Sequence, residues 1–305
     1  MQPLFHLGYP KCGSTFLQAR LFHAHPALKI ISPHAPLGIQ TETSGSPEVE
    51  AFTTALSGPA KQAAPLSEFN VETLFPKDGR RGVFTEENAL TKGVEPAVVI
   101  SRLASYFPDA RVLFILRDQV DLLRSYYDMY PTIGAPPRDR YAPFSEWIDW
   151  VIGGGHYLGA RLKYDTAVRS AISIFGRDQV FAVDFDALFK RHERLGDFCA
   201  FVGVEQGFVE AAFGQPAAND FTAYSARKLA RRILGPVRAS WFLPYSVIWK
   251  LQLRLGKLIP AERTVARQED IEAITAHFRE SNHALFDLDP PGFHPATWKS
   301  SRHSR

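Results

Sequence analysis

A glycine-containing segment near the start of the chain carries the residue types that bind a phosphate group. Gly8 and Gly13 stand five residues apart, Lys11 lies between them, and hydroxyl side chains follow at Ser14 and Thr15. An apolar run precedes the segment and a helical pattern follows it, so we expect a loop that leads into a helix N-terminus. Unpaired backbone N–H groups and the positive end of a helix dipole converge at such a junction. The first chemistry that the sequence predicts is therefore anion binding.

The order of residues in this segment differs from the loop of nucleotide triphosphatases. In that loop, two glycines five apart are followed by Lys and then by Ser or Thr. Here Ser14 takes the lysine position, Thr15 takes the hydroxyl position, and the lysine lies inside the loop as Lys11. A triphosphatase without that lysine and without an acidic residue closing a later apolar strand is disfavoured. We interpret Cys12 as a small loop residue, since nothing nearby in the sequence argues for a nucleophile.

A second segment, residues 111–127, combines an apolar run, a charged turn and a helical pattern. Asp118 is a candidate N-cap with Asp121 three residues later, so the helix is expected to begin directly after Arg117. Arg117 then lies at the carboxyl end of a strand, and Ser125 lies two turns into the helix. Parallel sheets bind ligands at this edge, and an arginine fork with a serine hydroxyl suits a phosphate. Taken singly, the two residues also fit a salt bridge at the helix start and an ordinary surface serine.

Together the two segments resemble the signatures of sulfotransferases that use 3′-phosphoadenosine 5′-phosphosulfate (PAPS). Residues 9–15, Tyr-Pro-Lys-Cys-Gly-Ser-Thr, match every fixed position of that family's 5′-phosphosulfate-binding loop, usually Pro-Lys-(Ser/Ala/Cys)-Gly-(Ser/Thr)-Thr. Arg117 and Ser125, eight residues apart, resemble the family's pair that holds the 3′-phosphate of the nucleotide. The resemblance implies transfer of a sulfuryl group from PAPS to a hydroxyl or amine of an acceptor, with a glycan as one candidate. It implies that the nucleotide is bound by Lys11, Cys12, Gly13, Ser14, Thr15, Arg117 and Ser125.

Such a transfer needs a base, because the acceptor loses a proton as it attacks sulfur. A third apolar run, residues 82–85, leads to Glu86 and Glu87, and one of the two is expected to enter the site because successive strand residues face opposite ways. In the glycan-modifying branch of the family, the proposed base is a glutamate just before the next helix. That helix is expected near Asn88, which favours Glu87. Glu86 and His34 are the alternatives, His34 being the analogue of the small-molecule branch, and a surface role for both glutamates is the plainer interpretation.

The resemblance also assigns a role to the loop. Lys11, with the N–H groups of residues 13–15 and the helix dipole, is expected to stabilise negative charge on the oxygen that leaves toward the 5′-phosphate. No metal is expected, because protein donors already grip the nucleotide and the sequence shows no convincing cluster of metal ligands. Two other classes stay open. A P-loop kinase would share the fold and need Mg²⁺, and a non-catalytic nucleotide-binding protein at a membrane surface would lack the base.

The elements that must position these residues form an alternating pattern. Strands alternating with helices predict an α/β fold with three layers, α/β/α, and a central, mainly parallel sheet. The expected strands are residues 4–7, 28–31, 82–85, 112–116 and 180–183. The expected helices are residues 14–23, 96–107, 119–130, 160–175, 187–202, 223–234 and 271–285.

A single domain is predicted over residues 1–290, followed by a tail at 291–305. Residues 33–78, rich in Pro, Gly, Ser and Thr, are interpreted as irregular cover that borders the site. The C-terminal third alternates basic and aromatic side chains, which fits an ordinary amphipathic helix pair or peripheral contact with a membrane or acidic glycan. Its members are Arg227, Lys228, Arg231, Arg232, Arg238, Trp241, Phe242, Tyr245, Trp249, Lys250, Arg254 and Lys257.

Bulk composition limits the remaining classes. The chain has 305 residues of which 45% are hydrophobic, which excludes disordered and fibrous proteins. A net charge of +3 gives no general affinity for polyanions, so no nucleic-acid partner is expected. Two cysteines, Cys12 and Cys199, cannot form a disulfide framework and favour a reducing compartment. Residues 239–249, apolar but short and interrupted by Pro244, cannot span a bilayer, and no export signal precedes the first strand. We therefore expect a cytoplasmic protein.

Overall fold

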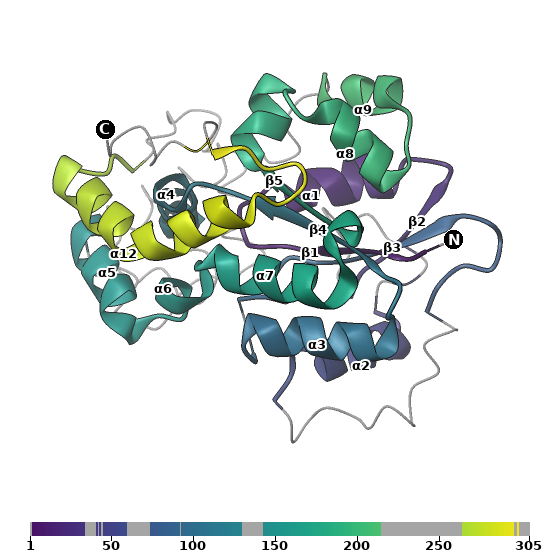
Figure 1. Ribbon diagram of the computed structural model, residues 1–305, viewed down its shortest axis with the longest axis horizontal. Helices are drawn as coiled ribbons and strands as arrows, with labels where there is room; N and C mark the ends of the chain where they lie inside the picture. The colour runs from purple at the N-terminus through teal and green to yellow at the C-terminus, as the bar shows by residue number, and fades with distance from the viewer. Residues whose placement is uncertain are drawn as a thin grey trace, which may run out of the picture.

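A five-stranded parallel sheet forms the centre of the protein. The computed structural model describes residues 2–33, 41, 43, 45–59, 74–91, 93–129, 143–214, 264–295 and 298. The strand order is β2-β3-β1-β4-β5, with every neighbouring pair parallel (Figure 1). The strands are β1 (Leu4–Leu7), β2 (Leu28–Ile31), β3 (Arg81–Glu86), β4 (Arg111–Leu116) and β5 (Val180–Asp184). Their apolar sequences are almost entirely buried, as in strands covered on both faces. The predicted fold class is confirmed.

Helices cover both faces because each connection between parallel strands crosses over the sheet. One face carries α1 (Ser14–Phe16) with its π-helical continuation η1 (Leu17–Phe22), then α8 (Leu195–Val202) and α9 (Gln206–Phe213). The other face carries α2 (Pro47–Ser57), α3 (Pro96–Tyr106) and α7 (Tyr164–Phe175), as Figure 1 shows. Two short turns, η7 (Arg177–Gln179) and η8 (Ala187–Arg191), stand at either end of β5.

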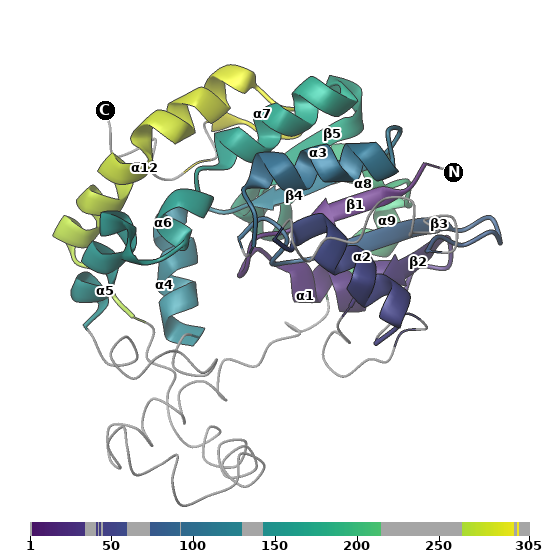
Figure 2. The same cartoon turned by 90° about the horizontal axis from the view of Figure 1, so that it is seen from below.

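A group of helices beyond the carboxyl edge of the sheet completes the fold. It consists of α4 (Gln119–Met129), α5 (Phe144–Trp150), η6 (Val151–Gly155), α6 (Leu158–Arg161) and α12 (Gln268–Leu288). Figure 2 shows α4 running away from the sheet with α5, α6 and α12 beside it. Inside this group the Gln119 amide donates to Asn282 Oδ1 at 2.8 Å, and the Asn282 amide donates back to Gln119 Oε1 at 3.2 Å. The start of α4 is thus fixed by a helix far away in the sequence.

The core between the sheet and its helices is rich in aromatic rings. Phe5 of β1 lies 5.1 Å from Phe107 and 5.5 Å from Phe75, measured between ring centroids.

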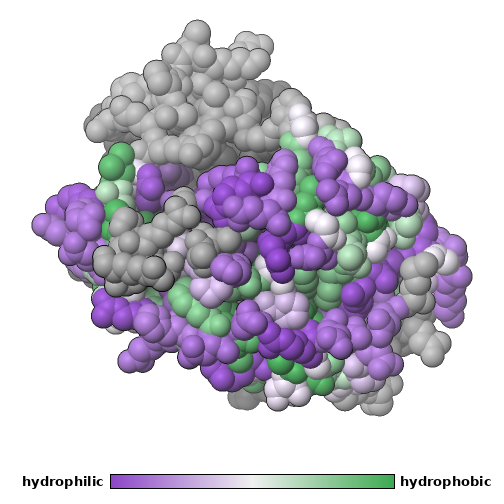
Figure 3. Space-filling view, turned by 45° about the horizontal axis from the view of Figure 1, so that its top comes forward, coloured by the Kyte–Doolittle hydropathy of each residue, from purple (hydrophilic) through white to green (hydrophobic). Residues whose placement is uncertain are grey.

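Figure 3 shows a face where polar side chains prevail and apolar ones form small groups. No helix in the described ranges is long and apolar enough to cross a membrane. In the same ranges, the large hydrophobic side chains that are exposed are Val98, Tyr157, Ile174 and Val265.

The expected irregular cover contains a helix. Residues 47–57 form α2, which has Pro47 in its first turn and buries Val49, Phe52 and Leu56. These apolar residues recur at three- and four-residue steps and pack toward α3, which outweighs the turn-forming composition around them. The prediction of irregular structure is therefore wrong for this stretch. Much of the remaining cover, including His34, lies outside the described residues.

Three expected helices are interrupted, and two others were not predicted. The helix expected at 160–175 divides at Leu162 and Lys163 into α6 and α7, and the one expected at 187–202 ends at His192, whose φ is +57°. The helix expected at 14–23 becomes π-helical after Phe16, where the His23 N–H reaches Gln18 O at 3.0 Å. Helices α5 and α9 were not predicted. The helix expected at 223–234 and the basic aromatic stretch lie outside the described residues.

The expected tail begins inside the folded domain. The Ala182 N–H of β5 donates to Pro291 O at 2.9 Å, and Trp298 is completely buried against Tyr164 and Phe293. A large indole removed from water contributes roughly 2–3 kcal/mol of apolar burial. The boundary at residue 290 is therefore wrong, at least as far as residue 298.

Candidate active site

The loop between β1 and α1 has the backbone geometry of an anion-binding turn. Lys11 has φ +67° and Gly13 has φ +81°, and such left-handed residues in a turn direct successive N–H groups inward. A Cβ added at Gly13 would lie only 2.8 Å from the Phe189 ring, so this position requires glycine for two reasons. Ser14 and Thr15 follow in the first turn of α1, where backbone N–H groups have no helical partner. The loop therefore offers a set of N–H donors at a helix N-terminus.

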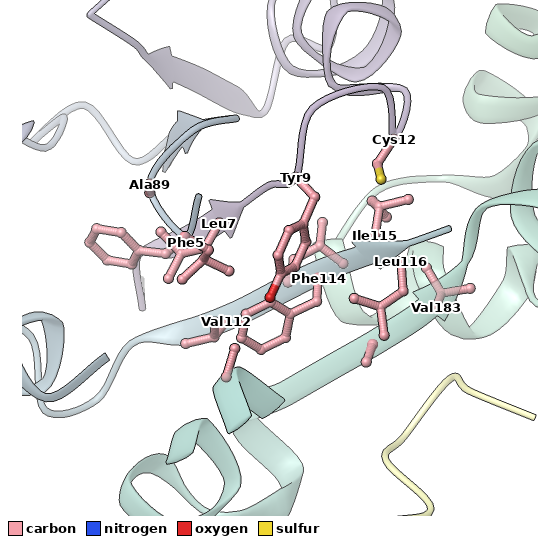
Figure 4. Close-up of a cluster of buried hydrophobic side chains, with 14 of the residues drawn as sticks. Phe5, Leu7, Tyr9, Cys12, Ala89, Val112, Phe114, Ile115, Leu116 and Val183 are labelled. Atoms are coloured by element: carbon pink, nitrogen blue, oxygen red, sulfur yellow. The ribbon is translucent and has the colours of Figure 1, made fainter. Parts of the chain in front are cut away.

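Two side chains anchor this loop to the sheet. The Tyr9 ring is completely buried and lies edge-on to Tyr164, with ring centroids 4.7 Å apart. Cys12 is also buried, and Figure 4 shows Tyr9 and Cys12 pointing from the loop toward β4. Burial raises the pKa of the Cys12 thiol to about 12, so the group stays protonated and unreactive at neutral pH. The geometry agrees with the interpretation of Cys12 as a small packing residue.

Arg117 joins the two segments that the sequence singled out. It follows the last residue of β4, and its Nη1 donates to the Lys11 carbonyl at 2.8 Å, across a sequence separation of 106 residues. Its guanidinium lies over the Phe185 ring, 4.8 Å from the centroid, while the Tyr164 hydroxyl donates to the Arg117 carbonyl at 2.9 Å. Arg117 Nε is buried without a hydrogen-bond partner among the described residues. The guanidinium therefore borders the loop and has donors beyond the one bonded to the Lys11 carbonyl.

Helix α4 begins where the sequence predicts. The Val120 N–H donates to Asp118 Oδ1 at 3.0 Å, which confirms Asp118 as the capping residue. Ser125 lies half-buried two turns farther on, in the same helix that starts beside Arg117.

The far end of α4 is held by a residue from the C-terminal part of the chain. Thr264 donates from its hydroxyl to Asp128 Oδ1 at 2.5 Å, and its carbonyl accepts from Arg124 Nε at 3.0 Å and Nη2 at 2.9 Å. These bonds to charged groups are stronger than neutral ones, and they fix the helix that carries Ser125. This contact is not predictable from the sequence, because nothing in the pattern near Thr264 indicates a partner in α4.

The two candidate bases have different surroundings. Glu86, the last residue of β3, is buried, and its Oε1 accepts the Asn88 N–H at 2.9 Å. Glu87 faces the loop, where the Ser14 hydroxyl donates to Glu87 Oε2 at 2.5 Å. Gly8 makes this approach feasible, since a Cβ there would lie 3.1 Å from Glu87 Cα. The Glu87 side chain thus contacts the loop through Ser14.

A buried polar network connects the elements beneath the loop. His6 Nδ1 of β1 and Thr85 Oγ1 of β3 are 2.9 Å apart, and Gln18 Nε2 of η1 donates to the same hydroxyl oxygen at 3.0 Å. Burial lowers the pKa of His6 to about 4, so the imidazole is neutral at pH 7. The network ties together β1, β3 and η1. Gly8 directly follows β1, Glu87 directly follows β3, and Ser14 lies in α1, which continues into η1.

Lys11 lies near charged groups of both signs. Burial lowers the pKa of its ammonium group, Arg117 lowers it further, and the carboxylates of Glu87 and Asp128 act in the opposite direction. Partial desolvation strengthens the field that the ammonium exerts on a nearby anion. Lys11 therefore combines a strong interaction with negative charge and a proton that is lost at lower pH than from a solvated lysine.

The residues after β5 form a part of the site that sequence reasoning missed. Phe185 and Phe189 lie against each other, with ring centroids 4.8 Å apart, beside Arg117 and Gly13. The preceding Asp184 is buried, which raises its carboxyl pKa to about 6, and its Oδ1 accepts the Ala187 N–H at 2.8 Å. A signal was present, because Phe185 follows an apolar strand directly, as Arg117 and Glu87 do. The rings of Phe185 and Phe189 line the side of the loop that faces β5.

Fold and site define an α/β protein with a strand–loop–helix anion site at the carboxyl edge of a parallel sheet. Residues 2–211, well over half of the chain, match the model of the Sulfotransferase domain, and the chain belongs to this family. It is therefore an enzyme of sulfuryl transfer. Among the described residues, no group of three or more His, Cys, Asp or Glu is arranged to hold a metal ion.

One solved sulfotransferase shares the architecture at low sequence identity, and a second gives a weaker match. The sulfotransferase from Alicyclobacillus acidocaldarius is 20% identical, with a TM-score of 0.54 and coverage of 94% of this chain and 95% of that one. The sulfotransferase domain from the curacin biosynthetic pathway is 14% identical, with a TM-score of 0.42 and coverage of 91% and 97%. No curated protein sequence gives a significant match. The first of these structures supports the fold.

Proposed function

We propose that this sulfotransferase uses PAPS as its donor and transfers the sulfuryl group to a hydroxyl or amine of an acceptor. The observation that carries the proposal is the bond from Arg117 to the Lys11 carbonyl. It brings the 5′-phosphosulfate-type loop and the 3′-phosphate-type arginine, which are distant in sequence, to one place. A nucleotide with phosphates at both its 5′ and 3′ positions is the ligand that needs both.

The residues present fit such a nucleotide. The turn at Gly13 has no room for a side chain and offers backbone N–H groups, which suits the 5′ end. Arg117 has a buried Nε without a partner among the described residues, and Ser125 lies on the helix that starts next to it, which suits the 3′-phosphate. We assign the donor to Lys11, Cys12, Gly13, Ser14, Thr15, Arg117 and Ser125, with Cys12 contributing backbone only.

PAPS supplies an activated sulfuryl group whose transfer leaves negative charge on the 5′-phosphate. Lys11 and the N–H groups of residues 13–15 stabilise that charge, and they are already in place before the reaction, so little reorganisation is needed. Glu87 takes the proton from the acceptor, since it is the carboxylate at the loop side of β3. Glu86 supports it from the strand, with its own carboxylate engaged by the Asn88 N–H.

A glutamate base favours a glycan hydroxyl or amine as the acceptor, in line with the glycan-modifying branch that the sequence resembles. Cytoplasmic location is supported by the two cysteines, Cys12 and Cys199, both buried and free. Contact of the basic C-terminal stretch with a membrane or an acidic glycan stays a prediction.

Calorimetry with two nucleotides tests the donor. We expect 3′-phosphoadenosine 5′-phosphate to bind at least tenfold more tightly than adenosine 5′-phosphate, roughly the value of one charged hydrogen bond. Equal affinities would contradict the proposal. Turnover of radiolabelled PAPS with a panel of glycans, lipids and small alcohols then identifies the acceptor, and dependence on Mg²⁺ and ATP would favour the kinase alternative.

A further inference from the structure

The hydrogen bond between Ser14 and Glu87 links the donor loop to the base. Ser14 Oγ donates to Glu87 Oε2 at 2.5 Å, and Ser14 itself is only 2% exposed. A serine hydroxyl has a single proton to donate. Phosphate oxygens at pH 7 only accept hydrogen bonds, so the Ser14 proton serves Glu87 or a donor oxygen, but not both.

The geometry around this bond is fixed by the sheet. Parallel pairing sets Leu7 opposite Glu86, and the Gly8 N–H extends the pairing by donating to Glu86 O at 3.2 Å. Strand pairing therefore fixes the position of Glu87 relative to the loop. Because Gly8 has no side chain, its backbone can lie close to the backbone of Glu87. The contact with Ser14 is a consequence of strand register, and any anion bound by the loop must compete with it.

We propose that Ser14 is a positioning residue that holds Glu87 until the phosphate end of the donor takes over its hydroxyl. Donor binding thereby releases the carboxylate, so the base becomes available to the acceptor only when the sulfuryl group is in place. This inference rests on the proposed function, since it takes the loop as the donor site and Glu87 as the base. It makes donor binding the first step of the reaction.

The transfer of the Ser14 hydrogen bond from Glu87 to the donor affects the affinity for the nucleotide, so a binding measurement can detect it. A hydrogen bond to a carboxylate is charge-assisted and stronger than a neutral one. The protein loses this bond when the nucleotide arrives, so Glu87 weakens nucleotide binding partly through Ser14. The rest of its effect is repulsion between two negative charges, which does not need the hydroxyl.

A double-mutant cycle separates the two contributions. The affinity for 3′-phosphoadenosine 5′-phosphate is measured by calorimetry in the wild-type protein, Ser14→Ala, Glu87→Ala and the double variant. We expect Glu87→Ala to tighten binding by roughly tenfold when Ser14 is present and by only about two- to threefold in the Ser14→Ala background. Binding needs no acceptor and no turnover, so the unknown acceptor does not affect the readout.

Thr15→Val is the matched control, because it removes the neighbouring hydroxyl of the same loop. Its effect and that of Glu87→Ala on affinity should add. Equal effects of Glu87→Ala with and without Ser14 would overturn the exchange while leaving the donor assignment intact. Failure of the wild-type protein to bind the nucleotide would instead overturn the proposed donor, and this inference with it.

Discussion

The arginines at the two edges of the sheet have different surroundings. The starting edge is the one at which the parallel strands begin, and the finishing edge is the carboxyl edge at which they end. At the starting edge, Arg81 of β3 donates from Nη1 to the Val202 carbonyl at 2.5 Å, and Arg111 of β4 lies over the Phe201 ring at 4.2 Å. At the finishing edge, Arg117 lies over Phe185 and donates to a loop carbonyl that also borders the anion site.

The difference comes from which helix ends meet each edge. Helix α8 ends at the starting edge, where its free carbonyls and negative dipole end neutralise Arg81. Helices α1 and α4 begin at the finishing edge, so their positive ends add to the charges of Lys11 and Arg117. At the starting edge, Arg81 Nη1 bonds to helix carbonyls within the protein, whereas the finishing edge gains stability from an anion. The finishing edge thus serves the reaction, and the starting edge serves the stability of the fold. The variants below test this contrast.

The largest effect is expected at the base. Glu87→Gln should lower turnover by roughly a hundredfold to ten-thousandfold, the usual value of general-base catalysis, with no loss of nucleotide affinity. Glu86→Gln is the matched control and should be mild, because the Glu86 side chain is engaged by the Asn88 N–H. Turnover and nucleotide affinity are measured separately. Near-normal turnover of Glu87→Gln together with loss of turnover in His34→Ala would show that Glu87 is not the base.

Lys11→Ala tests whether the charge at the finishing edge acts in the transition state. We expect turnover to fall by roughly a hundredfold to a thousandfold and nucleotide affinity to fall much less, since the ammonium meets most of its negative charge as the reaction proceeds. Burial lowers the Lys11 pKa, so wild-type turnover should also decline as pH rises, earlier than a solvated lysine would require. A loss confined to the KM for the donor would refute this role.

Arg117→Ala and Arg81→Ala compare the two edges directly. Arg117→Ala should weaken binding of 3′-phosphoadenosine 5′-phosphate by about 1.5–3 kcal/mol, because charged hydrogen bonds to the phosphate are lost. Arg81→Ala should leave that affinity unchanged and lower the free energy of unfolding by about 1–3 kcal/mol, since the last carbonyls of α8 lose their partner. Calorimetry and urea unfolding of both variants test the comparison. The contrast fails if each variant changes both quantities equally.

The smallest effect concerns a buried acid at the finishing edge. Burial raises the Asp184 pKa to about 6, so its ionisation destabilises the fold as pH rises from about 4 to 6, and the penalty persists above. Asp184→Asn should raise the free energy of unfolding at pH 8 by roughly 1–3 kcal/mol, and the gain should vanish near pH 4. Asparagine keeps an oxygen for the Ala187 N–H. Asp178→Asn, at an exposed position, is the control, and a gain at both pH values would argue against the ionisation.

Local patterns in the sequence predicted the sheet well. The five strands lie where the apolar runs predicted them, with ends that shift by at most one residue, because buried parallel strands need nearly continuous apolar sequence. The cap at Asp118 was also predicted, since Asp followed by a helical pattern is a local signal. The breaks at Lys163 and His192 were not, because tertiary packing decides them.

The family resemblance assigned the two segments to one nucleotide, but the contacts that join them were not predicted. Ser14 contacts Glu87 because β1 pairs with β3 in one particular register, which no local pattern encodes. Thr264 bonds to Asp128 of α4, which lies 136 residues earlier in the sequence. Phe185 comes close to Gly13 because it directly follows β5, the strand that pairs with β4. Long-range pairing supplies these contacts. The sequence favoured Glu87 only by its place before the expected next helix, and it did not predict the bond from Ser14.

The central place of β1 has a consequence for synthesis of the protein on the ribosome. β1 is made first, yet its two neighbours are β3 and β4, whose sequences begin at Arg81 and Arg111. At about 5–20 residues per second, the nascent strand waits several seconds to tens of seconds before both partners exist. During that time Leu4, Phe5 and Leu7, all fully buried in the finished enzyme, have no sheet to join. The residues of the donor loop are thus translated before both strands that flank β1, and their conformation is settled only after β4 has emerged.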